Sequence, residues 1–364
     1  MILTARTDDD NRRLDRILRK ALPELPLSAL HRLLRKGLVR VNGRSARGED
    51  RIQEGAEIYI DAIHLNTLHL NTLPGELKRI QPKTRPFFAG FAGEEDLKRM
   101  RFKSRRPVPA IGPKTGINLD ILWEGAGLLI LNKPAGLAVH GESPDRNRRR
   151  GTAPDTLERR VRAYLTGRLP ESLSFKPGPL HRLDKPTSGV IVFSESLEGA
   201  RRFSALLRGG KIRKRYLALL DGELAGDEVW EDMLLRDTAA RKTRIVPAAA
   251  EPADGARPAL TGVTPLARAR EGSRAWTLAR LETGTGRTHQ IRAQAARRGH
   301  ALSGDRKYGG LPIPAAGPGF FLHAAELELP EAFVPLIRAP LPEAFRRVLK
   351  SIFGKTTLSQ NHAL

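Results

Sequence analysis

A nine-residue string in the middle of the chain constrains fold and chemistry more than any other feature. Residues 181–189 read His-Arg-Leu-Asp-Lys-Pro-Thr-Ser-Gly, and the apolar run Val-Ile-Val-Phe follows at 190–193. Leu183 can be buried, the neighbouring hydroxyl groups can bind the local backbone, and Gly189 permits a sharp entry into a strand. The string predicts a rigid loop that holds Asp184 at the mouth of a sheet, where catalytic residues are common. A lone aspartate more often caps a turn, but the length of the string favours a functional one.

The charge of the chain predicts a polyanionic partner. The 364 residues include 63 Lys and Arg against 40 Asp and Glu, which gives a formal net charge of +23. Nucleic acid is the first candidate, because no long apolar run or amphipathic basic tail favours a membrane surface. The start of the chain has no apolar signal core, so we expect a cytoplasmic protein.

The absence of cysteine and the low content of aromatic residues argue against several classes of binding site. The chain has no cysteine, which removes disulfides, zinc–thiolate sites and thiol nucleophiles. Nine histidines are scattered along the sequence without a metal-ligand spacing, so no metal site is expected. Aromatic residues make up only 5% of the chain, which argues against a broad base-stacking surface.

The first sixty residues predict a small module of two helices and a short sheet. Residues 12–22 place apolar side chains on one helical face, and a second helix is expected to start with Ser28 as its cap and to end at Gly37. Strands are expected around 39–41 and at 57–60, and Asn42–Gly43 predicts a tight turn. A positive stripe of Arg32, Arg35 and Lys36 on the second helix is predicted to contact phosphates, and Arg40 is a further predicted RNA-binding residue.

Changes in amino-acid composition indicate the domain boundaries in the rest of the chain. Residues 63–119 are rich in Pro, Gly and basic residues and predict a linker, and residues 142–155 predict a polar, basic surface loop. We therefore expect an N-terminal module at 1–62, the linker, a larger domain at 120–350 and a tail at 351–364.

The larger domain shows strand and helix patterns around the central string. Strands are expected at 128–131, 137–140, 214–221 and 274–282, and helices at 157–165 and 197–207. A further helix should follow a glycine-rich turn, with Thr288 as its cap and Gly299 at its end. The sequence between residues 227 and 271 has no clear pattern that predicts helices or strands.

The string at 181–189 resembles the signature of the RluA-type pseudouridine synthases, which isomerise chosen uridines in RNA. The run Lys-Arg-Tyr-Leu-Ala at 214–218 and the run Arg-Thr-His-Gln-Ile-Arg at 287–292 extend the resemblance. Residues 12–60 are similar to the S-four-type RNA-binding domain. The two resemblances imply an α+β chain: a small N-terminal module, a long linker, and a mixed, mainly antiparallel sheet flanked by helices.

The resemblance also implies roles for single residues. Asp184 would be the catalytic residue, Tyr216 would stack near the uracil and assist removal of the carbon 5 proton, and Arg287 would be the cationic partner of the aspartate. RNA would be bound by three further residues: Arg182, which would fill the space of the extruded base, Ile291 as an apolar floor, and His181 at the start of the string.

The expected function is isomerisation of uridine to pseudouridine in RNA, with large-subunit ribosomal RNA as the expected substrate and no cofactor. Two alternatives keep the fold, namely a non-catalytic RNA-binding or ribosome-assembly protein and a synthase acting on transfer RNA. A hydrolase that pairs Asp184 with His181 or His289 is a third. The sequence indicates no protein partner, so a monomer is the default.

Overall fold

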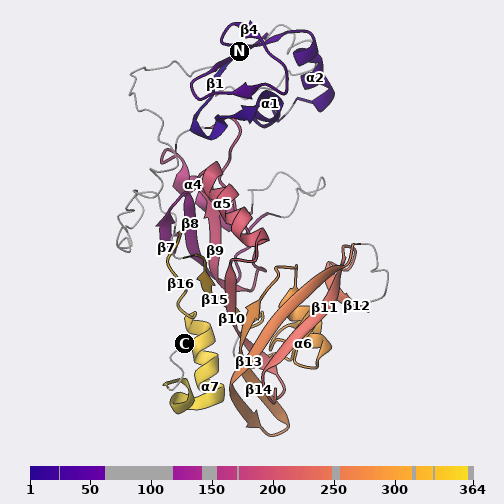
Figure 1. Ribbon diagram of the computed structural model, residues 1–364. Helices are drawn as coiled ribbons and strands as arrows, with labels where there is room; N and C mark the ends of the chain where they lie inside the picture. Colours follow the sequence, from indigo (N-terminus) through magenta and orange to yellow (C-terminus); the bar gives the residue numbers. More distant parts are fainter. Residues whose placement is uncertain are drawn as a thin grey trace. The chain divides into compact units, whose positions relative to one another are not determined.

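The computed structural model describes residues 1–23, 25–61, 118–141, 154–169, 172–247, 255–313, 317–330 and 333–359 (Figure 1). They form two compact units, and described residues 1–61 together with 172–176 belong to the first. The predicted linker at 63–119 lies outside the described residues except for its last two. The predicted loop at 142–155 lies outside them in the same way.

The first unit is a small α+β module. Its four-stranded sheet has the order β1-β6-β3-β4, and β2 pairs with β5 separately. The elements are β1 (Ile2–Thr4), 3-10 helix η1 (Thr7–Asp9), β2 (Arg12–Arg13), α1 (Leu14–Ala21), α2 (Leu27–Arg35), β3 (Val39–Val41), β4 (Arg44–Ser45), β5 (Arg51–Ile52) and β6 (Glu57–Ile60).

Most local predictions for this unit are confirmed. Both helices and the strands at 39–41 and 57–60 form, and the apolar face of α1 is buried. Asn42 and Gly43 both have positive φ, 48° and 79°, as a tight turn between β3 and β4 requires. The predicted cap at Ser28 is wrong, because α2 begins at Leu27 with Pro26 before it and no side chain caps it.

A segment more than a hundred residues further along the sequence, residues 172–176, completes the first unit. The Asp9 carboxylate is fully buried and accepts hydrogen bonds from the backbone N–H groups of Leu173 (3.0 Å) and Ser174 (2.9 Å). The Ser172 hydroxyl donates to the same carboxylate, and Arg12 donates to Ser174. Leu173 packs against the core of this unit. The predicted N-terminal module, residues 1–62, therefore does not include residues 172–176, which belong to the first unit.

The second unit is built on one ten-stranded sheet, which confirms the predicted fold class. Its order is β12-β11-β13-β14-β10-β15-β9-β8-β7, with β16 beside β15, and only the β9–β15 pair is parallel. The strands are β7 (Ile121–Gly125), β8 (Leu128–Lys133), β9 (Ser188–Ser194), β10 (Arg213–Asp221), β11 (Glu228–Asp237), β12 (Lys242–Val246), β13 (Arg257–Glu271), β14 (Arg274–Thr283), β15 (Leu322–Glu328) and β16 (Ile337–Arg338).

Helices flank this sheet. They are α4 (Leu157–Leu165), α5 (Leu197–Arg208), α6 (Gln290–Arg297), the 3-10 helix η4 (Arg306–Tyr308) and α7 (Glu343–Ser359). Figure 1 shows α5 beside β8 and β9, and α6 against β11 to β13. The helices predicted at 157–165 and 197–207 are confirmed, whereas α7 continues into the segment predicted as a tail.

Two further predictions are corrected by the second unit. No strand forms at 137–140, because the chain turns at Gly136 and the Leu137 carbonyl accepts a hydrogen bond from the buried Lys133 ammonium. The described residues between 227 and 271, for which the sequence predicted no elements, form β11, β12 and all of β13.

Gly189 fixes the point where the central string enters the sheet. It pairs with Lys133 of β8 on one side and with Ala324 of β15 on the other, and its φ is +105°. A Cβ atom at this position would lie 2.2 Å from the Ala324 carbonyl oxygen, so only glycine allows this approach. The loop that carries Asp184 is thereby held against the parallel strand pair.

We predict that Gly189→Ala destabilises the second unit far more than Gly136→Ala. Gly136 also has a positive φ, +84°, but no atom lies within 4 Å of its added Cβ. The control should cost about 1–2 kcal/mol from backbone strain alone, and Gly189→Ala about 3 kcal/mol more from the clash. Urea unfolding of both variants measures the difference, and equal losses would show that the close approach is unimportant.

Candidate active site

One cavity of about 580 Å3 in the second unit gathers the residues predicted for the catalytic half of the chain. Its walls come from the loop before β9, the start of β10, the turn after β14 and the first turn of α6. The predicted residues that line it are His181, Arg182, Asp184, Tyr216, Arg287 and Ile291. Segments more than a hundred residues apart in sequence thus meet at one place.

The loop that holds Asp184 is anchored from beneath by Lys133. The Lys133 side chain is fully buried, and its ammonium donates to the carbonyls of Pro134 (2.8 Å), Leu137 (2.7 Å) and Lys185 (3.1 Å). Burial lowers the pKa of Lys133 to about 7, against the opposing effect of the Asp184 charge. Three carbonyl acceptors match the three N–H bonds of an ammonium, so the contact fixes the backbone beside the aspartate.

Arg292 bridges two carboxylates in the cavity wall. Its Nη1 donates to Asp184 Oδ2 at 2.9 Å, and its Nε and Nη2 donate to the two oxygens of Asp305 at 2.6 and 2.8 Å. The guanidinium lies over the rings of Tyr308 (4.8 Å) and Phe320 (4.5 Å). Burial lowers the pKa of Arg292, but the two carboxylates outweigh it and the net pKa is raised. The cation is therefore permanent and orients the Asp184 carboxylate.

The expected partner of Asp184 was Arg287, and the structure gives this place to Arg292. Arg287 is exposed, and its Nε donates to the Pro258 carbonyl at 3.1 Å. The reason is the start of α6, which lies at Gln290 after His289 in the left-handed region (φ 54°), so Thr288 is not the cap. With this start, the second arginine of the 287–292 run faces Asp184.

His289 also lines the cavity, although the sequence analysis named it only as a partner of Asp184 in the hydrolase alternative. Its Nε2 lies 3.9 Å from Asp184 Oδ1, and its Nδ1 lies 2.9 Å from the Tyr308 hydroxyl. Burial lowers the pKa of His289 to about 4, the Asp184 charge opposes this shift, and the charge of Arg292 adds to it. Such a weak base suits hydrolysis at neutral pH poorly, which argues against the hydrolase alternative.

Tyr216 and Ile291 form the less polar part of the wall. Tyr216 is half-buried on β10, and burial raises the pKa of its hydroxyl to about 12, with the Asp184 charge acting in the same direction. The phenol is therefore neutral at pH 7. Ile291 is buried in the first turn of α6.

His181 braces the loop against β9. Its Nε2 accepts a hydrogen bond from the Val192 N–H at 3.1 Å, and its ring stacks on Phe203. Burial lowers the pKa of His181 to about 3, and the Lys214 charge lowers it further. A neutral imidazole whose Nε2 is an acceptor for the backbone is no general base, which again disfavours the hydrolase. Arg182, the next residue, is exposed at the cavity.

We predict that His181 makes the second unit sensitive to acid. Since the folded-state pKa of about 3 lies below the usual 6.5, its contribution is full above pH 6.5 and is lost as the pH falls toward 3. Between about pH 7 and 4.5 the wild type should lose about 2 kcal/mol more free energy of unfolding than His181→Gln, which keeps an acceptor near Nε2. Urea unfolding at both pH values checks this, and parallel pH profiles would contradict it.

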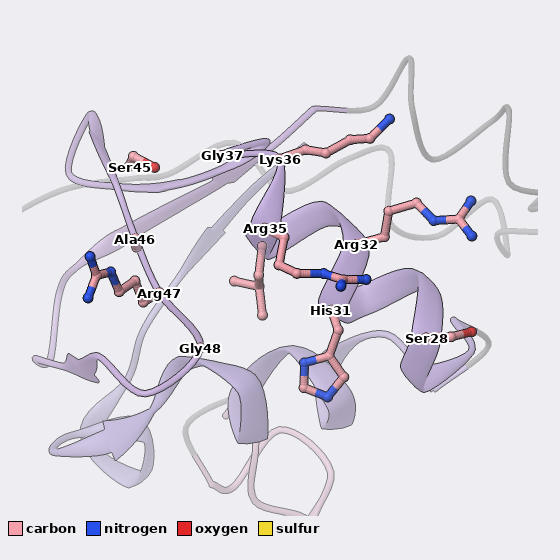
Figure 2. A pocket seen from close by; sticks show the side chains of 11 residues that line it. Ser28, His31, Arg32, Arg35, Lys36, Gly37, Ser45, Ala46, Arg47 and Gly48 are labelled. Atoms are coloured by element: carbon pink, nitrogen blue, oxygen red, sulfur yellow. The ribbon is translucent and has the colours of Figure 1, made fainter.

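The first unit carries a separate basic hollow of about 1040 Å3. Figure 2 shows Arg32, Arg35 and Lys36 on and just after α2, with Arg47 across from them on the chain after β4. The predicted stripe thus lines one surface, except for Arg40, which is exposed on β3 but is not part of this lining. Arg47 was not predicted as an RNA-binding residue, because it lies outside α2 and no helical spacing relates it to the basic residues there.

Both units resemble known proteins in sequence. The sequence model described as RNA pseudouridylate synthase matches residues 127–297, and the S4 domain model matches residues 12–58. The chain is 28% identical over 362 residues to the ribosomal large subunit pseudouridine synthase C of Escherichia coli, with 96% of each protein covered. It is 27% identical to the protein of the same name from Vibrio cholerae, covering 88% of this chain and 86% of that protein.

A solved structure supports the fold. The human RNA pseudouridylate synthase domain containing 4 matches with a TM-score of 0.50 and 21% identity, over 63% of this chain and 91% of that chain. In the part of the chain that the structure describes, no helix is long and apolar enough to cross a membrane, and no group of three or more His, Cys, Asp or Glu side chains is placed to hold a metal ion.

Proposed function

We propose that the chain is an RNA pseudouridylate synthase, the family whose model matches residues 127–297, and that it converts uridine to pseudouridine with Asp184 as the catalytic residue. The observation that carries the proposal is the placement of this carboxylate. Asp184 lies in a cavity of about 580 Å3, is oriented by the buried Arg292, and has the apolar Ile291 and the phenol of Tyr216 in the same wall.

The reaction needs no external reactant. The bond from ribose carbon 1′ to N1 of uracil breaks, and a bond from carbon 1′ to carbon 5 forms. Carbon 5 loses a proton and N1 gains one, so atoms and electrons balance without a cofactor. A carboxylate can attack as a nucleophile or accept the 2′ proton of the ribose, and both roles need the ionised form that Arg292 pairs with.

The other cavity residues are assigned positions around the base. Ile291 would lie under the uracil ring, and Tyr216 would stack beside it and donate a hydrogen bond. Because the phenol is neutral at pH 7, Tyr216 is not a base for the carbon 5 proton. Arg182 is exposed at the cavity and would fill the space left when the base is extruded, a step that costs about a few kcal/mol.

We propose ribosomal RNA of the large subunit as the substrate. The similar proteins from Escherichia coli and Vibrio cholerae are named for that subunit, and the match covers nearly the whole chain. The basic hollow of the first unit suits phosphate contacts, which hold a structured RNA without reading its sequence.

Asp184→Asn should abolish pseudouridine formation. It removes the carboxylate charge and keeps the size of the side chain, so we expect a loss of at least about 1000-fold in tritium release from RNA labelled at carbon 5 of uridine. Ribosomal and transfer RNA transcripts, tested separately, would identify the substrate class.

Lys185→Met is the matched control, because this side chain is exposed on the same loop and does not line the cavity. It should release tritium like the wild type. Full activity of Asp184→Asn would show that another residue is catalytic. Binding of RNA by the wild type without any release would favour a non-catalytic RNA-binding or assembly protein.

Removing two charges from the basic hollow should weaken RNA binding in a salt-dependent way. In the double variant Arg32→Ala and Arg35→Ala, the slope of log K against log salt concentration should fall by about 2, with kcat unchanged. The control is Arg19→Ala with Lys20→Ala, which removes equal charge from exposed positions on α1 outside the hollow. Equal slopes for the two double variants would contradict a specific role of the hollow.

A further inference from the structure

The active-site cavity holds more positive charge than its chemistry uses. Its charged lining residues are the single acid Asp184 and the cations Arg182, Arg208, Lys214, Arg287 and Arg292. Arg292 is paired with Asp184 and Asp305. Among the described residues, none of the other four cations forms an ion pair, so four positive charges face the cavity without a carboxylate.

Lys214 differs from the other three because its side chain is enclosed. It is half-buried at the start of β10, whereas Arg182, Arg208 and Arg287 are exposed. Its Nζ makes one long hydrogen bond, 3.3 Å to the Thr285 carbonyl, which leaves N–H donors of the ammonium unused. Burial lowers the pKa of Lys214, and the charge of Arg287 lowers it further. Two cations close together in a partly desolvated wall destabilise the empty cavity and favour an anion.

The backbone beside Lys214 is shaped to admit its ammonium. A Cβ atom on Gly286 would lie 3.2 Å from the Lys214 Nζ, and the φ of Gly286 is outside the left-handed region, so this glycine supplies space and no special backbone conformation. Gly284, two residues earlier in the same turn, meets only the side chain of Leu260 at ordinary distance, 3.4 Å.

We propose that Lys214 and Arg287 together bind a phosphodiester group of the RNA strand next to the uridine in the cavity, with Lys214 as the positioning residue. This rests on the proposed function. Every nucleotide carries a phosphate on each side of its ribose, so a uridine at Asp184 brings at least one into this region. Uracil is neutral and needs no pair of cations, whereas a phosphate accepts hydrogen bonds from both.

The test removes the charge of Lys214 and the charge of one RNA phosphate, separately and together. The substrate is a short RNA that contains the responding uridine, used unmodified and with a neutral methylphosphonate at the linkage on its 5′ or 3′ side. Lys214→Met should lower kcat/KM on unmodified RNA by about 10- to 100-fold. One methylphosphonate should cause a similar loss in the wild type and little additional loss in Lys214→Met, because the two changes remove the same contact.

Further variants test whether the position of the Lys214 ammonium matters or only the presence of a positive charge. Gly286→Ala, which places a Cβ atom 3.2 Å from the ammonium and keeps the lysine, should lose activity in the same direction. Lys211→Met removes an exposed charge outside the cavity lining and should match the wild type. Lys214→Arg should recover part of the loss, and thermal unfolding of each variant verifies that it is folded.

The outcomes distinguish this inference from the proposed function. If the wild type forms no pseudouridine in any RNA, the proposed function fails. If the wild type is active but the losses from Lys214→Met and from each methylphosphonate multiply independently, Lys214 does not bind a phosphate and this inference alone is overturned.

Discussion

The guanidinium of Arg292 is the contact on which the active site depends. It shares one cation between Asp184, which faces the cavity, and Asp305, which is 2% exposed. Burying two carboxylates and a cation is costly, and here the cost is offset by three hydrogen bonds and by the rings of Tyr308 and Phe320. Without the arginine, Asp305 would be a buried charge with no counter-ion and Asp184 would lose its orientation.

The sheet brings the members of this contact together from distant parts of the chain. Asp184 comes from the loop before β9, Arg292 from α6 and Asp305 from the turn before η4. Two local devices fix the loop: Lys133 binds its backbone from beneath, and Gly189 lets β9 approach β15 without a side chain between them. Errors in any of these elements would shift the carboxylate relative to Arg292.

The sequence predicted what is encoded locally. The string around Asp184 is continuous, so its loop could be predicted before any contact was known, and Asn42–Gly43 specifies its turn by backbone conformation alone. The two helices of the first unit followed from apolar periodicity, which reports a single buried face.

Predictions from the sequence were wrong or incomplete where a contact depends on residues distant in sequence or on the exact first residue of a helix. Choosing between Arg287 and Arg292 requires the first residue of α6, and a left-handed His289 sets that boundary without a recognisable cap. The binding of residues 172–176 to Asp9 joins positions more than 160 residues apart, and no local pattern marks it. Lys133 and Lys214 were visible in their motifs, but only burial distinguishes them from ordinary surface lysines.

In the proposed function, the cavity separates the group that would react, Asp184, from the groups that would bind RNA. Burial keeps His181 and His289 neutral at pH 7 and raises the pKa of the Tyr216 phenol further above neutrality, so none of these three cavity side chains is charged at that pH. The remaining charge is positive and stands around the aspartate. In the proposed function, exposed cations such as those of the hollow in the first unit would supply affinity that salt screens, whereas the half-buried Lys214 would act at short range. Affinity for RNA and placement of one nucleotide can therefore be supplied by different residues of the same chain.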